Sequence, residues 1–113
     1  MKNANIETIN RKELKAKLDR GDNFKLIMTM DDRAYDHMHI PGSMHFNNML
    51  EALKWLKPDD EVVLYCSTKW CHDSINAGLV LEDNGFRKIY RYVGGLEDWE
   101  QAHYPLEGDM VQH

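Results

Sequence analysis

The sequence has little cysteine, little proline and no long apolar run. It contains two cysteines and three prolines in 113 residues, too few cysteines for a disulfide scaffold. The longest apolar run, residues 62–66, suits a buried strand and is too short to cross a bilayer. The first seven residues are polar, so we expect no secretory signal and a cytoplasmic location, where thiols stay mostly reduced.

The size and charge of the chain narrow its class further. With 42% hydrophobic residues, the chain has enough apolar material for one core, so we expect a single domain over residues 1–113. The formal net charge of -5 argues against nucleic acid or an anionic membrane surface as the main partner. The oligomeric state cannot be predicted from the sequence.

Apolar patterns of two kinds alternate along the chain. We predict strands over residues 5–8, 24–30, 61–66 and 88–93. Helical patterns fall between them, over residues 11–20, within 31–39, and over 49–56, 74–83 and 96–102. Asn10 and Glu13 form a capping box for the first helix, and Trp55 and Trp99 are expected in the core. The alternation predicts an α/β fold with a mainly parallel central sheet and helices on both faces.

Cys66 is the candidate reactive residue. It is the last residue of the predicted strand 61–66, so it should lie at the carboxyl edge of the sheet, where ligands bind in open parallel sheets. A short loop and the start of a helix follow, and this order directs backbone N–H groups and the positive end of the helix dipole at the loop. Such a position favours the reactive thiolate, although free cysteines are also common as small core residues.

Four segments, in order, resemble the rhodanese homology family. His39-Ile-Pro-Gly-Ser43 is similar to the family's His-Ile-Pro-Gly-Ala motif, and residues 62–66 resemble the strand that leads to its catalytic cysteine. Residues 74–86 resemble the helix after the active-site loop, and Gly94-Gly95 with Trp99 resembles the family's ending. The resemblance covers nearly the whole chain and implies a rhodanese-like domain.

The resemblance implies sulfur transfer with Cys66 as the nucleophile and no cofactor. Cys66 would attack a sulfane-sulfur donor, become a persulfide and pass the outer sulfur to a thiol or cyanide. The amides of the following loop would hold the anionic persulfide. That substrate-binding loop comprises Ser67, Thr68, Lys69, Trp70, Cys71 and His72.

Two departures from the family pattern bear on the activity. Where the family carries Asp-Val-Arg at the end of the second strand, this chain has Met28, Thr29 and Met30, so the acid and the arginine are both missing. The loop arginine of thiosulfate-using members is also absent, and Lys69 is the nearest cation. Among the candidate donors, thiosulfate and persulfides, these departures favour a protein or small-thiol persulfide over thiosulfate, and whether the missing charges abolish activity stays open.

Cys71 has three interpretations. The spacing of Cys66, Cys71 and Ser74 resembles a subgroup with a Cys-x4-Cys-x2-Ser loop. Cys71 is a candidate resolving thiol that closes a disulfide with Cys66, a candidate sulfur acceptor, or an inert residue packed beside the loop. Trp70 in the same loop is a candidate cover for the site or a docking residue.

Phosphatase and zinc chemistry fit the sequence poorly. A Cys-x5-Arg loop needs an arginine where this chain has His72, and imidazole cannot grip an oxyanion in a bidentate manner. Cys66, Cys71 and His72 lack structural zinc spacing, and His39 matches a motif histidine that holds its turn by ring hydrogen bonds. We expect no metal. The alternative to an enzyme is a weak or inactive module on the same fold, for partner binding or for Cys66/Cys71 thiol-disulfide sensing.

Overall fold

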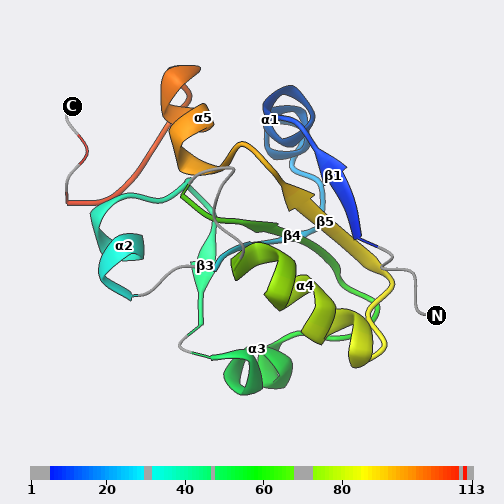
Figure 1. Cartoon of the computed structure of the whole chain (residues 1–113). Coiled ribbons are helices and arrows are strands. Elements are labelled where there is room, and N and C mark those ends of the chain that lie inside the picture. Colours follow the sequence, from blue (N-terminus) through cyan, green and yellow to red (C-terminus); the bar gives the residue numbers. More distant parts are fainter. Residues whose placement is uncertain (1–5, 30–31, 47, 68–72, 110, 112–113) are drawn as a thin grey trace.

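A computed structural model describes residues 6–29, 32–46, 48–67, 73–109 and 111 (Figure 1). Strands and helices alternate along the chain, as the sequence pattern predicts. The elements are β1 (Ile6–Ile9), α1 (Arg11–Arg20), β2 (Lys25–Met28), α2 (Asp32–His37), β3 (Met44–His45), α3 (Met49–Trp55), β4 (Glu61–Tyr65), α4 (Asp73–Asp83), β5 (Lys88–Tyr92) and α5 (Gly95–Gln101).

The strands form one five-stranded sheet in the order β1-β5-β4-β2-β3. All four strand pairs are parallel. The central strand β4 pairs with β2 on one side and β5 on the other, and Tyr65 at its end lies opposite Met28 and Tyr92. The chain therefore leaves the middle of the sheet directly after Tyr65, between two neighbouring strands that end at the same level.

Helices cover both faces of the sheet. α1 and α5 lie on one face and α3 and α4 on the other (Figure 1). Along β4, Val63 and Tyr65 belong to the core under α1 and α5, whereas Val62 and Leu64 belong to the core under α3 and α4. This alternation explains why β4 reads as a continuous apolar run, because a strand buried on both faces has no polar side. The predicted α/β class is confirmed.

The first helix begins and ends where the sequence signals place it. The side chain of Asn10 accepts a hydrogen bond from the Glu13 amide, and the Glu13 carboxylate accepts one from the Asn10 amide. Gly21 ends the helix in the left-handed conformation at φ 71°, and its amide donates to the Leu18 carbonyl. The predicted capping box and the end near Gly21 are both confirmed.

Three details of the sequence prediction are wrong. The short edge strand β3 (Met44–His45) was not expected, because two residues are too few to show a period. Trp55 was expected in the core but is 72% exposed. Ala52 on the inward side of α3 and Leu56 directly after the helix are buried, whereas Trp55 at the end of the helix lies outside this buried side. Trp99, by contrast, is 1% exposed, as expected.

The third error concerns the end of the central strand. β4 ends at Tyr65, so Cys66 is the first residue after the strand and not its last residue. The Cys66 carbonyl accepts a hydrogen bond from the Leu96 amide of α5. Within the described ranges, no helix combines the length and apolar character that crossing a lipid bilayer requires.

Candidate active site

Cys66 is buried at the carboxyl edge of the sheet, with 2% of its surface exposed. Two amides in the first turn of α5 hold the backbone on either side of it. The Leu96 amide donates to the Cys66 carbonyl at 2.9 Å, and the Glu97 amide donates to the Ser67 carbonyl at 2.8 Å. The first amides of a helix have no partner within the helix, so the Cys66–Ser67 segment both satisfies them and is fixed by them.

Gly95 permits this close approach of α5 to the candidate nucleophile. Its φ of 69° lies in the left-handed region, and a Cβ at this position would stand 2.6 Å from the Cys66 carbonyl oxygen. Only glycine satisfies both conditions. Gly95 of the Gly94-Gly95 pair recognised in the sequence therefore has a direct structural role beside Cys66.

Only part of the predicted loop can be placed. Ser67 is half-buried directly after Cys66, and α4 begins at Asp73. Thr68, Lys69, Trp70, Cys71 and His72 lie outside the described residues, so their predicted roles stay predictions.

Cys66 is disulfide-bonded in the structure, so the form shown is oxidised. A sulfur in a disulfide is not a nucleophile, and the thiolate forms only after reduction. Any activity of Cys66 as a nucleophile therefore begins from the reduced protein.

The end of β2 is apolar next to the site. Met28 is buried, where the resemblance leads one to expect an acid. Thr29 follows it and donates twice to the Tyr65 carbonyl, from its amide at 2.9 Å and from its hydroxyl at 3.2 Å. Met30 lies outside the described residues. This side of the site is thus braced by hydrogen bonds to the backbone just before Cys66 and not by an ion pair at Met28.

Tyr65 is a structural residue of the site that the sequence reasoning missed. Its buried hydroxyl accepts a hydrogen bond from the Ile40 amide at 3.0 Å and lies 2.8 Å from the Ser43 hydroxyl. Ser43 in turn donates to the Ile40 carbonyl at 2.6 Å. Burial raises the pKa of Tyr65 to about 12. A tyrosine directly before the cysteine was the only signal in the sequence, and its partners lie some twenty residues earlier.

The turn at residues 39–43 is therefore tied to the residue before Cys66. His39 holds the turn from the other side, since its Nδ1–H donates to the Tyr35 carbonyl at 2.7 Å and its ring stacks on that of Tyr35 at 3.9 Å. The predicted structural role of His39 is confirmed by this geometry. Among the described residues, no three His, Cys, Asp or Glu side chains are arranged to hold a metal ion.

A second missed contact anchors the helix that follows the loop. Arg91 of β5 donates from Nε to the Ser74 hydroxyl at 2.9 Å, and Ser74 is buried in the first turn of α4. This hydrogen bond joins β5 to the beginning of α4. Ser74 was singled out only by its spacing from the cysteines, and the contact gives it a structural reason.

The sequence matches a known family of domains. The family model described as "Rhodanese-like domain" matches residues 10–102, which include β4, Cys66 and the Gly94-Gly95 turn. The chain belongs to the rhodanese-like domain family.

Several curated relatives of this rhodanese-like chain carry names that refer to sulfur transfer. It is 30% identical over 84 residues to the thiosulfate sulfurtransferase GlpE of Pseudomonas syringae, covering 73% of this chain and 76% of that protein. It is 24% identical over 98 residues to the putative sulfur carrier protein YrkF of Bacillus subtilis. That match covers 85% of this chain but 52% of YrkF, so the chain spans about half the length of that relative.

Solved structures share the fold of this rhodanese-like chain. The BH2092 protein of Bacillus halodurans superposes with a TM-score of 0.83 at 20% identity, over 95% of this chain and 85% of that one. The polysulfide-sulfur transferase of Wolinella succinogenes superposes with a TM-score of 0.74 at 24% identity, over 97% and 84% of the two chains. At these identities the likeness establishes the fold.

Proposed function

We propose that this chain is a sulfurtransferase in which Cys66 takes up sulfane sulfur as a persulfide and passes it to an acceptor. The observation that supports this most strongly is the position of Cys66, buried at the end of the central parallel strand with its backbone held by α5. A family match over residues 10–102 and relatives named for sulfur transfer point the same way.

The first half-reaction loads the cysteine. The Cys66 thiolate attacks the outer sulfur of thiosulfate, a new S–S bond forms, and the bond to the sulfonate sulfur breaks. Sulfite leaves with that electron pair, and Cys66 becomes a persulfide. With a protein or small-thiol persulfide as donor, the leaving group is the donor thiolate instead. Splitting the transfer in this way replaces one difficult step with two easier ones.

The second half-reaction transfers the sulfur from Cys66 to the acceptor. The thiolate of the acceptor attacks the terminal sulfur of the persulfide, the S–S bond to Cys66 breaks, and the Cys66 thiolate is released. Ser67, Thr68, Lys69, Trp70, Cys71 and His72 are proposed to form the loop whose amides hold the anionic persulfide. Preorganised amides of this kind stabilise negative charge on the reacting sulfur.

Reduction must come first, because Cys66 is disulfide-bonded in the structure. We propose that a small-molecule thiol supplies the electrons: two thiols are oxidised to their disulfide while the two protein thiols are released. The Cys-x4-Cys spacing makes Cys71 the proposed resolving residue. A reducing, cytoplasmic setting would suit this cycle.

The chemistry near Cys66 favours persulfide donors over thiosulfate. Thiosulfate carries two negative charges, and the chain lacks the family's loop arginine and its strand-end arginine. A dianion is bound weakly without these groups, because arginine holds an anion through two charge-assisted hydrogen bonds at once. The proposed partners are therefore small-molecule or protein persulfides, and the net charge of -5 gives no reason to add nucleic acid.

The test is the intact mass of the reduced protein after incubation with a sulfane-sulfur donor. Reduced protein should gain the mass of one sulfur atom, and cyanide should remove it as thiocyanate. Cys66→Ser should neither gain the mass nor form thiocyanate, whereas the matched variant Cys71→Ser should still gain it. Equal gain in wild type and Cys66→Ser would contradict the proposal.

A thiol-disulfide sensing module is the second candidate, favoured by the disulfide-bonded state of Cys66 and by the apolar Met28 in place of an acid. In this case the cysteines cycle between dithiol and disulfide without turnover. The reduced protein treated with mild peroxide should lose two hydrogens and yield a Cys66–Cys71 peptide on digestion. Absence of this bridge would count against the sensing module.

A further inference from the structure

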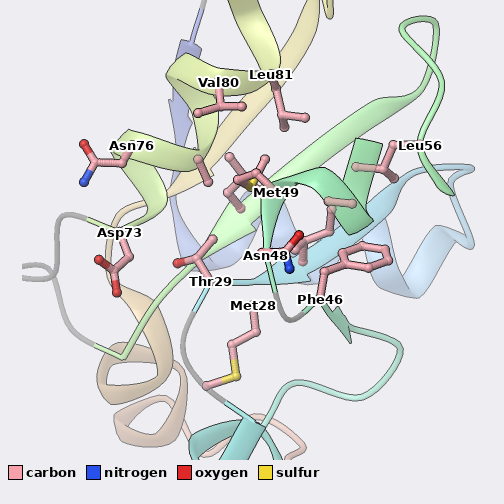
Figure 2. A pocket seen from close by; sticks show the side chains of 14 residues that line it. Met28, Thr29, Phe46, Asn48, Met49, Leu56, Asp73, Asn76, Val80 and Leu81 are labelled. Atoms are coloured by element: carbon pink, nitrogen blue, oxygen red, sulfur yellow. The ribbon is translucent and has the colours of Figure 1, made fainter. Parts of the chain in front are cut away.

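A cavity of about 230 Å³ lies between α3, α4 and the sheet, on the side of Leu64 (Figure 2). Its floor is the face of β2 and β4, where Ile27 and Leu64 line it. Its walls are the inward side chains of the two helices. These wall residues are Met49, Ala52, Leu56, Ala77, Val80 and Leu81.

The mouth of the cavity is polar, in contrast to its interior. Four of the lining residues carry hydroxyl, amide or carboxylate groups, and Figure 2 labels all four: Thr29, Asn48, Asp73 and Asn76. Asn48, Asp73 and Asn76 are exposed to solvent. An apolar interior with a few polar groups at the entrance is the usual character of a small-molecule site.

The volume indicates how large the bound group is. Protein interiors are close-packed, so a void of this size lined by apolar side chains stands out from ordinary packing. An engineered apolar cavity of about 150 Å³ binds benzene, whereas drug-sized ligands fill roughly 300–1,000 Å³. A cavity of about 230 Å³ therefore fits one aromatic ring or a branched alkyl group with its linking atoms.

The mouth lies at the same edge of the sheet as Cys66. Thr29, at the mouth, donates two hydrogen bonds to the carbonyl of Tyr65, the residue before Cys66. Asp73, also at the mouth, is the first residue of α4, which follows the loop beginning at Cys66. Leu64, on the floor, precedes Cys66 by two residues. A ligand whose apolar end fills the cavity thus has its other end at the carboxyl edge of the sheet, where Cys66 lies.

The charge at the mouth limits the kind of ligand. Asp73 supplies a carboxylate, and no lysine or arginine is among the described residues that line the cavity. An anionic ligand would be repelled, and a neutral or cationic one would not. We propose that this cavity binds the apolar aryl or alkyl group of a small organic thiol, uncharged or cationic, that serves as the sulfur acceptor of Cys66. The acceptor role rests on the proposed function, whereas the binding does not.

The binding arm uses benzyl methyl sulfide, an uncharged thioether that cannot exchange sulfur. In methyl NMR spectra of the reduced protein, it should shift the signals of Leu64, Val80 and Leu81. Val80→Phe fills the cavity and should weaken this binding about tenfold, as expected from the loss of one buried apolar contact group. Leu79→Phe is the matched control, because Leu79 lies on the same helix, is 41% exposed and does not line the cavity. Absence of shifts in those methyl groups at millimolar thioether would overturn the proposal.

The transfer arm compares two acceptors of the persulfide-loaded protein, benzyl thiol and the anionic 2-mercaptoethanesulfonate. The wild-type protein should have a KM for benzyl thiol about tenfold or more below that for the sulfonate. The ratio of the KM for the sulfonate to the KM for benzyl thiol should fall about tenfold in Val80→Phe and stay unchanged in Leu79→Phe. Asp73→Asn, an exposed change that does not disturb the core, should lower the KM for the sulfonate.

Equal KM values for the two thiols in the wild type, or an equal effect of Val80→Phe and Leu79→Phe, would overturn the acceptor role. If Cys66 forms no persulfide at all, the proposed function fails. The thioether shifts then still decide whether the cavity is a binding site, so the two failures are distinguishable.

Discussion

The Cα of Gly95 lies against the backbone carbonyl of Cys66, so that a Cβ on residue 95 would stand 2.6 Å from the carbonyl oxygen. The neighbouring amide of Leu96 donates to the same oxygen at 2.9 Å. The start of α5 and the candidate nucleophile are therefore positioned as one unit. A substitution at Gly95 would displace the backbone of Cys66 directly, because the contact is with its carbonyl oxygen and not with its side chain.

Gly95→Ala should destabilise the protein by about 2–4 kcal/mol and change the rate at which reduced Cys66 is alkylated by iodoacetamide. The reason is twofold: alanine is strained at a φ of 69°, and its Cβ would collide with the Cys66 carbonyl. Urea unfolding measures the stability, and mass spectrometry follows the alkylation. The loss of stability should lower the urea concentration at the unfolding midpoint.

Gly21→Ala is the matched control for this prediction. Gly21 has nearly the same φ, 71°, but a Cβ there meets nothing within 4 Å. It should cost about 1 kcal/mol, the strain of the left-handed conformation alone, and leave Cys66 alkylation unchanged. An equal loss of stability in the two variants would show that the contact with Cys66 has no energetic effect.

Tyr65→Phe should cost about 1–3 kcal/mol of stability, because it leaves the buried Ile40 amide without its acceptor. It also removes one of the two hydrogen-bond partners of the Ser43 hydroxyl. Tyr90→Phe is a suitable comparison, since no hydrogen bond of the half-buried Tyr90 hydroxyl is found among the described residues, and it should change stability by less than about 0.5 kcal/mol. Urea unfolding at neutral pH measures both, and a Tyr65→Phe effect as small as the Tyr90→Phe effect would refute the role of the Tyr65 hydroxyl.

The stability of the protein should fall as the pH rises from 10 to 12. Burial raises the pKa of Tyr65 from 10.0 to about 12, so in this window the unfolded chain loses the phenolic proton and the folded protein keeps it. The unfolded state then binds fewer protons, and the free energy of unfolding decreases with pH, by about 2–3 kcal/mol for this group over the window. Below pH 10 the contribution is fully present.

Burial and the hydrogen bond to Asp98 also raise the pKa of Tyr92, so its contribution has the same sign. Urea unfolding at a series of pH values, for wild type and Tyr65→Phe, isolates the first group. The difference in stability between the two proteins should shrink as the pH rises through this range. A difference independent of pH would contradict the raised pKa of Tyr65.

Trp99→Ala should destabilise the protein by about 3–5 kcal/mol, whereas Trp55→Ala should change stability by about 0.5 kcal/mol or less. Trp99 is buried, packs edge-on against Tyr92 and Tyr104, and donates from its indole N–H to the Pro105 carbonyl at 2.8 Å. Trp55 is exposed. Thermal unfolding of both variants is the measurement. Comparable destabilisation by the two changes would contradict the packing described.

Much of the fold could be predicted because its signals are local. The capping box of Asn10 and Glu13, the apolar run of β4 and the glycine that ends α1 each act within a few residues of the chain. The order of strands and helices then restricts the sheet to parallel pairing, since each crossover needs a helix. The edge strand β3 escaped prediction because two residues carry no period.

The candidate site could likewise be predicted only in part. Cys66, the turn at residues 39–43 and the Gly94-Gly95 pair could be recognised in the sequence as separate motifs. Their mutual contacts could not, because the bond from Ile40 to Tyr65 and the bond from Arg91 to Ser74 join residues that are far apart in the chain. Nothing local distinguishes Arg91 from an ordinary strand residue, and the position of Tyr65 directly before Cys66 does not reveal its partners.

By itself the sequence determined the elements other than β3, the α/β class and the identity of the candidate nucleophile, because these depend on local propensity, periodicity and motif order. Only the tertiary structure decided that Trp55 faces solvent, that α5 rests on the Cys66 carbonyl, and that an apolar cavity opens beside Asp73. These features depend on how separate elements pack against one another. No single stretch of the sequence specifies how side chains that are far apart in the chain pack together.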